Sequence, residues 1–596
     1  MTVTKETFVQ LEEKYAKVIK LLEEDSKFDP ETEPYLSKYS ARQILIGMKA
    51  QIENLLRGQG LEESCQKKLN AMLGTVYLYL GMISVETGEV SNGKSHLEKC
   101  KEIIEKFQME PDFILIALNM YNQFGIMLSV TEPESSKLYL DIAENLYADF
   151  KSKDVNPIDI SDLFQLNNKS HDVEIGLKNL EKIHTLTLYY LAQIFGAMQD
   201  ALKSSVYCHL TLKKQLEMSD YDPIDWALNA ATLSQFFMEK NCFKQARHHL
   251  AASLFILDEH KKQLDFNKEE TEAYNAQLET YNHRSADVAR CWLKYGIMLL
   301  SKSKERLLNH TDDADTEHCS LSTNFSDLNI NFEGNLSKYD LKNLIFSDLN
   351  IGSYEQEITD QFILVLPDAK KVFLHSQMWA NKAQEYYTLE TLASDFIEIV
   401  LDQTQLYYNL IFFEDDPENQ AKLHKRRIKL LENIIANVNS QYYLQYCRQV
   451  WFELARTYAD ILDIKYDKLR DTKSRPTPHS LAKINHLIDN GITHYTNFIN
   501  SFKDKVTEVL PEKIPEDVER PFLQAYFHKA ALYGRYVSLD KEVQLKNTEL
   551  SLACYKYVND YCEKYKKSKE LIPMESGICK EMVTLLPVKI LKLKNS

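Results

Sequence analysis

Apolar residues recur every three or four positions from residue 1 to about 300, and again from about 366 to 590. This spacing gathers them on one face of an α-helix, whereas stretches with the two-residue alternation of a β-strand are short and rare. The intervening residues, 306–362, are rich in Asn, Ser and Asp. They are typical of a partly flexible linker or a long loop with a short helix inside. The sequence therefore predicts two helical regions on either side of a polar segment.

Small residues repeat along the helical regions on a longer scale. A tetratricopeptide hairpin has L-G-x2-Y in its first helix and A-x3-F in its second, and the small residues let the two helices approach closely. Three pairs of small residues are separated by the same interval of twelve: Gly81 and Gly93, Ala192 and Ser204, and Ser234 and Ala246. The pair Gly125 and Ser136 is one residue shorter. Successive copies stand roughly 42 to 67 residues apart instead of 34, which predicts hairpins with lengthened helices or loops.

The carboxyl-terminal region continues the series less regularly. Leu454-Ala455-x2-Tyr458 has the first-helix pattern, and its second helix is expected around 484–498, beyond the Pro/Ser loop at 470–480. Residues 530–536 and 551–562 form a looser candidate pair. The predicted fold is all-α, a right-handed α-solenoid of tetratricopeptide-like helical hairpins in two halves. The expected domains are 1–305, a polar acidic linker at 306–362, and 363–596.

Composition and charge narrow both the fold class and the kinds of partner. The 16 Gly and 15 Pro are few for a large β or α/β protein of 596 residues. A net charge of −16 argues against nucleic acid and anionic membranes as partners, although it permits a basic protein partner or serves solubility alone. The amino terminus has no signal-peptide core, and no run of 18 apolar residues is present, so no membrane insertion is expected. The ten cysteines form no CxxC motif, and we expect reduced thiols in the cytoplasm.

Motifs of catalysis and metal binding are absent from the sequence. There is no Gly-rich phosphate loop, no HExxH, no GxSxG and no Cys/His set with zinc spacing, so neither an enzyme nor a cofactor is expected. "HTDDADTEH" (310–318) is interpreted as a solvated acidic run and not as a metal site. "HKRRIKLLE" (424–432) could dock an acidic partner, but pairing with acidic loops of the same chain is the favoured interpretation.

Several specific stretches, in the same order over most of the chain, resemble the KIF-binding protein family, also called kinesin-binding protein. They are "YYLAQ" (189–193), "KKQLE" (213–217), "IDWALNAATLSQFF" (224–237), "ARCWLKY" (289–295), "HKRRI" (424–428), "QYYLQYCRQVWFELA" (441–455), "KYVNDYC" (556–562) and "KEMVTLLPVKI" (580–590). The first 40 residues and 306–362 share little with the family. The resemblance implies a cytoplasmic, cytoskeleton-associated adaptor, expected to be monomeric and without a cofactor. Such proteins bind the motor domains of selected kinesins in a concave groove and keep them off the microtubule.

The hairpin register predicts which residues face that groove. In a tetratricopeptide hairpin these positions lie one before and two after the Leu of the first helix, which selects Tyr190 and Gln193, then Thr232 and Gln235. The resemblance adds Gln215, because "KKQLE" matches the family. Polar side chains there can hydrogen-bond a partner helix. The alternative is that they are ordinary solvated residues or bonds between helices.

Two other functions remain open on the sequence. A tetratricopeptide co-chaperone would clamp an acidic peptide with Lys, Arg and Asn, whereas the expected groove offers Tyr, Gln and Thr. A scaffold subunit would bind a peptide partner within a large complex, without selectivity for motors.

Overall fold

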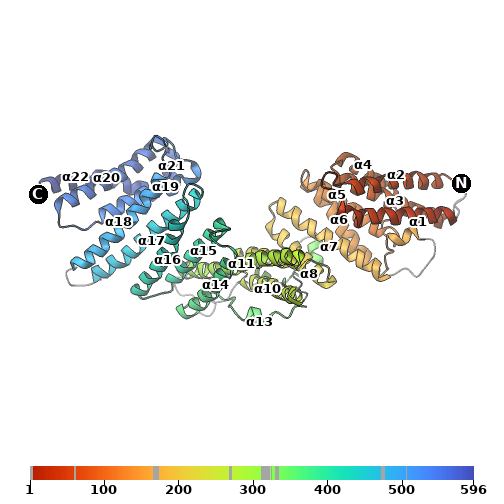
Figure 1. Cartoon of the computed structure of the whole chain (residues 1–596), viewed down its shortest axis with the longest axis horizontal. Coiled ribbons are helices and arrows are strands. Elements are labelled where there is room, and N and C mark those ends of the chain that lie inside the picture. The colour runs from red at the N-terminus through yellow and green to blue at the C-terminus, as the bar shows by residue number, and fades with distance from the viewer. Residues whose placement is uncertain are drawn as a thin grey trace. The chain divides into compact units, whose positions relative to one another are not determined.

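The computed structural model describes residues 5–58, 62–165, 173–266, 271–309, 323, 325–328, 334–341, 343–471, 477–504 and 506–595. Over these ranges the chain forms helices joined by turns and no β-strand. Figure 1 shows that many successive helices lie side by side as antiparallel pairs, and these pairs pack closely. The all-α fold of helical hairpins is therefore confirmed. The acidic run at 310–318 lies outside the described residues.

The chain divides into two compact units: unit 1 is residues 1–256 and 323–350, and unit 2 is residues 257–322 and 351–596. The helices of unit 1 are α1 (Lys5–Glu23), η1 (Asp25–Phe28), α2 (Leu36–Leu56), α3 (Glu63–Glu86), α4 (Val90–Ile104), α5 (Ile114–Leu128), α6 (Pro133–Lys151), η2 (Ser161–Phe164), α7 (Val173–Ala197), α8 (Ala201–Met218), α9 (Pro223–Glu239), η3 (Phe325–Leu328) and η4 (Gly334–Lys338). Helix α10 (Phe243–Phe266) begins in unit 1 and ends in unit 2.

Unit 2 contains the remaining helices. They are α11 (Glu272–Asn309), α13 (Gly352–Glu355), α14 (Leu366–Tyr386), α15 (Ala393–Ile411), α16 (Pro417–Asn437), α17 (Leu444–Asp471), α18 (Pro478–Asn500), α19 (Glu516–Gly534), α20 (Lys541–Lys564), α21 (Lys566–Leu571) and α22 (Pro573–Asn595). The domain boundaries expected from the sequence stay a prediction, because a compact packing unit need not fold as an independent domain.

Small residues lie where the two helices of a hairpin approach most closely. The hydroxyl of Ser204 on α8 donates a hydrogen bond to the carbonyl oxygen of Ala192 on α7, at 2.8 Å. A Cβ added at Gly93 on α4 would lie 3.2 Å from the carbonyl oxygen of Gly81 on α3. A larger side chain at these positions would push the helices apart, so the paired small residues have a packing cause.

The turns between these helices explain the repeated interval of twelve. Gly88, Gln199 and Asn241 have φ of 83°, 62° and 60°, and each lies seven residues after the small residue of its first helix. The N–H of the next residue donates to the carbonyl oxygen five residues earlier, as in a Schellman motif. These bonds join Glu89 to Ser84, Asp200 to Phe195 and Cys242 to Phe237, at 2.8, 2.9 and 2.8 Å. The hairpin with Gly125 and Ser136 has no described residue of positive φ in its turn and is one residue shorter.

The two hairpins expected near the carboxyl end are also present. A Cβ at Gly491 on α18 would lie 3.6 Å from the carbonyl oxygen of Ala455 on α17. The hydroxyl of Ser551 on α20 donates to the carbonyl oxygen of Ala530 on α19, at 2.8 Å. The same use of small residues at helix crossings therefore extends through unit 2.

Helix α3 is long and contains a strongly apolar window. By length and composition it alone among the described helices could cross a membrane, and 72% of its apolar window is buried inside the protein. Its neighbours α2, α4 and α5 pack against it. Its apolar sequence is therefore explained by its place in the core of unit 1. The nine cysteines in the described ranges are free, and most of them are buried.

Candidate partner-binding surface

Helix α7 presents Tyr190 and Gln193 near its carboxyl end. Its core side chains recur at helical spacing and include Leu180, Ile183, Leu188, Leu191, Ile194 and Phe195. Gln193 is exposed on the other side of the helix, and Tyr190 is partly buried there. The ring of Tyr190 meets Tyr189 edge to face, with 5.2 Å between centroids, and burial raises the pKa of Tyr190.

Helix α9 presents Thr232 and Gln235, both exposed. The carboxylate of Asp222 caps the helix by accepting two backbone N–H groups of the first turn, at 2.9 Å each, and Pro223 follows at the first helical position. The indole N–H of Trp226 donates to a carbonyl oxygen of α8 at 3.0 Å. Cap and indole fix the rotation of α9, so Thr232 and Gln235 face solvent.

Gln215 lies apart from Tyr190 and Gln193 of α7. It is half-buried near the end of α8, where its carbonyl oxygen accepts the N–H of Asp220 at 3.3 Å and so helps to end the helix. Its neighbour Lys214 pairs with Glu181, near the start of α7. The two helices are antiparallel, so Gln215 and Gln193 lie at opposite ends of the hairpin. Helix α8 contacts both α7 and α9 and separates the two register-related pairs.

The open sides of α7 and α9 offer uncharged polar groups beside apolar ones. The hydroxyls of Tyr190 and Thr232 and the amide of Gln193 form no hydrogen bond within the part of the chain that the structure describes. Leu186 and Tyr189 are exposed on the same helix, at 36% and 43%. This chemistry suits a partner helix better than catalysis. Partner binding by these residues and by Gln215 stays a prediction, and no group of side chains in the described ranges could hold a metal ion.

A second feature of unit 1 comes from the segment expected to be a linker. Residues 334–341 and 343–346, here called the strap, pack on α6 and α10. Lys338 Nζ donates to Asn145 of α6 at 2.8 Å. The backbone N–H of Phe346 donates to Nε2 of His248, on α10, at 2.8 Å, and the Phe346 ring is buried. This part of 306–362 is therefore an ordered element of unit 1.

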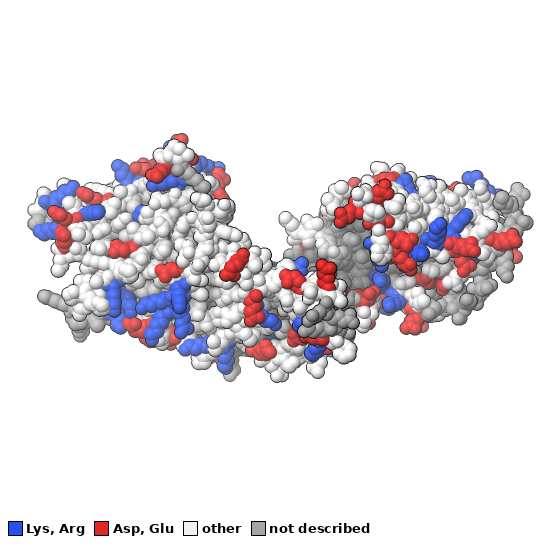
Figure 2. Space-filling model, in the orientation of Figure 1, with Lys and Arg blue, Asp and Glu red and all other residues white. Residues whose placement is uncertain are grey.

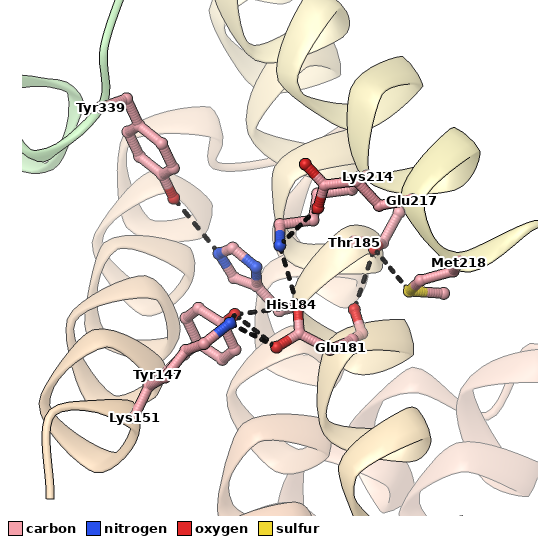
Figure 3. A network of polar contacts seen from close by, with 9 residues as sticks. All are labelled: Tyr147, Lys151, Glu181, His184, Thr185, Lys214, Glu217, Met218 and Tyr339. Carbon is pink, nitrogen blue, oxygen red and sulfur yellow. Dashed lines mark hydrogen bonds and ion pairs between the residues drawn. The ribbon is translucent and has the colours of Figure 1, made fainter. Parts of the chain in front are cut away.

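Tyr339 of the strap lines a cavity of about 480 Å³ together with residues of α6, α7 and α8 (Figure 3). Its hydroxyl lies 3.3 Å from Nε2 of His184. The His184 ring stacks on Tyr147 with 3.6 Å between centroids, and the Tyr147 hydroxyl donates to Glu181 at 2.8 Å. The network thus joins the strap to three helices through aromatic and charged side chains.

Opposite charges meet at this cavity. Burial raises the pKa of Glu181, but Lys151 and Lys214, at 2.6 and 3.0 Å, outweigh it and hold that pKa at about 2. Burial, with the nearby Lys214, lowers the pKa of His184 to about 3, so this ring is neutral. Burial raises the pKa of Glu144 to about 7, partly offset by hydrogen bonds from tyrosines. These groups position one another, and none is placed as a nucleophile beside a base.

Neither Tyr339 nor Glu144 was predicted from the sequence. The buried strap residues are Leu336, Leu341, Leu344 and Phe346. Their spacing of two to five positions matches neither a helix nor a strand, and polar residues surround them. The available signal was the presence of large apolar residues, these four and the exposed Ile345, in a segment otherwise rich in Asn, Ser and Asp.

Comparison with known proteins connects this fold to one family. Residues 224–593 match the family model "KIF-1 binding protein C terminal". The chain is 35% identical to the KIF-binding protein of Gallus gallus, over 98% of this chain and 97% of that protein. It is 34% identical to that of Drosophila melanogaster, over 100% and 98%. A solved structure, a cryo-EM map of KIFBP, matches 98% of this chain and 99% of its own, with a TM-score of 0.62 and 28% identity. The chain therefore belongs to the KIF-binding protein family.

Proposed function

We propose that this chain is a cytoplasmic, non-enzymatic protein that binds the motor domains of selected kinesins and blocks their attachment to microtubules. The full-length similarity to proteins named KIF-binding protein carries this proposal, because it includes both units. By preventing attachment the protein would regulate microtubule-based transport and organisation.

The exposed sides of α7 and α9 are the proposed contact for the motor. A helix of the motor laid across them would meet Tyr190 and Gln193 on one helix, and Thr232 and Gln235 on the other. The uncharged hydroxyl and amide groups would hydrogen-bond its polar side chains, and the nearby Tyr189 and Leu186 would cover its apolar ones. Such a contact needs no cofactor.

The charge of the chain favours the same partner. The surface of a kinesin that docks on acidic tubulin must be basic, and a net charge of −16 attracts it at long range. Attraction raises the rate of encounter, whereas the polar surface of α7 and α9 would select the partner. Occlusion then follows because the bound surface is the one that the microtubule needs.

Co-sedimentation tests the proposal. Motor domains of several kinesins are pelleted with stabilised microtubules, with and without the full chain. The expected result is that some motors leave the pellet as the chain is added, while others stay. If no motor leaves the pellet, the proposal is wrong. If the chain pellets together with a motor, the protein is an adaptor for cargo and not an inhibitor.

A further inference from the structure

A groove in unit 2 differs in character from the rest of this acidic chain. It has a volume of about 690 Å³ and lies between α16, α17 and α18. Figure 2 shows Lys and Arg side chains gathered over the part of unit 2 where these helices lie in Figure 1. We call it the basic groove. It contains none of the residues discussed for the motor contact.

The floor of the basic groove is apolar. Ile461 and Leu469 come from α17, and Ile484 and Leu487 come from α18. The spacing of each pair places its two residues on the same face of their helix. Leu469 and Leu487 are only half-buried. The volume is in the range of ligand-binding pockets. An occupant with apolar side chains would therefore remove further apolar surface from water.

The rim of the basic groove is positively charged. Lys425, Lys465, Lys468 and Lys483 line it, and Glu418 is the one acidic residue among the described residues of its lining. Lys468 and Lys465 bond Glu418 at 2.6 and 3.1 Å and lower the pKa of that carboxyl to about 2.

Two of the four rim lysines are available to pair with the carboxylates of a partner. Lys425 and Lys483 are exposed and form no ion pair within the described residues. The nearby Arg427 is different: it is buried and pairs with Glu453 and Asp460. In the basic run at 424–432, Arg427 therefore pairs within the chain, but with residues of helix α17 and not with the acidic loops expected from the sequence. Lys425 stays open.

We propose that the basic groove docks an acidic amphipathic helix of a partner protein, with its apolar face on the floor and its carboxylates beside Lys425 and Lys483. An apolar floor with a basic rim complements that helix on both counts. A nucleic-acid backbone would satisfy the lysines but has no apolar groups for the floor. A flat anionic membrane could reach the rim but would not fill the groove.

Fluorescence anisotropy on the full chain tests this inference with a labelled helical peptide of about 14 residues, roughly four turns, that carries Leu on one face and Glu on the others. The test variant is Lys425→Glu with Lys483→Glu. The control variant is Lys566→Glu with Lys567→Glu, which changes the net charge equally at exposed lysines of the same unit. We expect the test variant to weaken binding by at least about tenfold, the control to leave it unchanged, and added salt to weaken it.

Three results would overturn the inference. The first is no binding to the wild-type chain at peptide concentrations up to about 1 mM. The second is equal loss in both variants, which would indicate charge attraction without a site. The third is equal binding of a peptide with Ser in place of Leu, of single-stranded DNA or of anionic vesicles, because the apolar floor would then play no part. Motor binding is measured in a separate experiment, so a failure to bind motors would not contradict peptide binding in the basic groove.

Discussion

The hydroxyl of Tyr339 donates a hydrogen bond to Oε1 of Glu144 at 3.0 Å, although 195 positions separate the two residues in the chain. On the other oxygen of the same carboxyl, Tyr207 of α8 donates at 2.9 Å. A buried carboxyl is thus held between the strap and a neighbouring helix. Because an unpaired buried acceptor costs more than a hydrogen bond contributes, the strap and Glu144 stabilise each other.

Replacing Tyr339 with Phe should loosen the strap. The change removes a donor from a buried carboxyl, at a cost of about 1–3 kcal/mol, and the phenyl ring still occupies the place of the phenol ring. A convenient reporter is the backbone N–H of Phe346, which is bonded to His248. We expect its hydrogen exchange to become at least about fivefold faster. Tyr442→Phe is the control, since Tyr442 is 82% exposed. Unchanged exchange in the Tyr339 variant would mean that other contacts alone hold the strap.

Glu144 should make the stability of unit 1 depend on pH. Its folded pKa of about 7 lies above the ordinary value of 4.5, so the folded state binds the extra proton between these values. The contribution of Glu144 to stability therefore falls as pH rises through this window, by up to about 3 kcal/mol at ~1.4 kcal/mol per unit. Glu144→Gln removes this dependence. We expect the melting temperature of the wild type, relative to that of the variant, to decrease from about pH 5 to 8. A difference that stays constant with pH would contradict the raised pKa.

The helical fold could be predicted because its causes are local in the sequence. Ala192 and Ser204 are twelve residues apart, and a Schellman turn with positive φ at Gln199 determines that interval. Helical periodicity identifies the buried side of α7 and therefore its exposed side. The exposed positions of Gln193, Thr232 and Gln235 follow from the same register. The identity of the partner does not follow from it, because exposure is common to every surface.

The remaining features depend on contacts that no local pattern encodes. Tyr339 binds Glu144 across 195 positions in the chain. The polar sequence around Tyr339 does not indicate this hydrogen bond. In the basic run at 424–432, Arg427 is buried and Lys425 is exposed, although both are basic helical residues. Their difference depends on Glu453 and Asp460, which approach from α17. Gln215, named from the resemblance alone, was not placed by the register.

The crossing of α11 and α14 should tolerate no side chain at Gly296. A Cβ there would lie 2.9 Å from the Cβ of buried Ser376, closer than such atoms approach. We expect Gly296→Ala to destabilise unit 2 by about 1–3 kcal/mol through overpacking. Adding Ser376→Gly should restore part of the loss by clearing the contact. Gly47→Ala is the matched control, because that helical position is exposed with open space around it, and it should stabilise by up to about 1 kcal/mol. Chemical unfolding measures all four proteins, and equal effects at both glycines would refute the packing argument.

The proposed motor contact can be separated from folding by changing four side chains together. Replacing Tyr190, Gln193, Thr232 and Gln235 with Ala should leave helicity and melting temperature nearly unchanged, because Ala favours helices and these side chains lie on the open side. We expect affinity for a motor domain to fall at least about tenfold, or ~1.4 kcal/mol. Calorimetric titration of the motor measures the change.

The control must lose the same side-chain types from another exposed surface. Tyr442, Gln441, Gln277 and Thr280 are exposed in unit 2, and replacing these four with Ala removes one Tyr, two Gln and one Thr. Their loss should leave motor affinity unchanged, since the lost hydrogen-bonding groups belong to neither α7 nor α9. If both quadruple variants bind the motor like the wild type, the contact lies elsewhere. If both weaken it equally, general surface polarity, and not the register of α7 and α9, governs binding. A separate Gln215→Ala variant tests whether Gln215 also contacts the motor. Because Gln215 lies at the opposite end of the hairpin, we expect its effect on motor affinity to be independent of the effect of the other four residues.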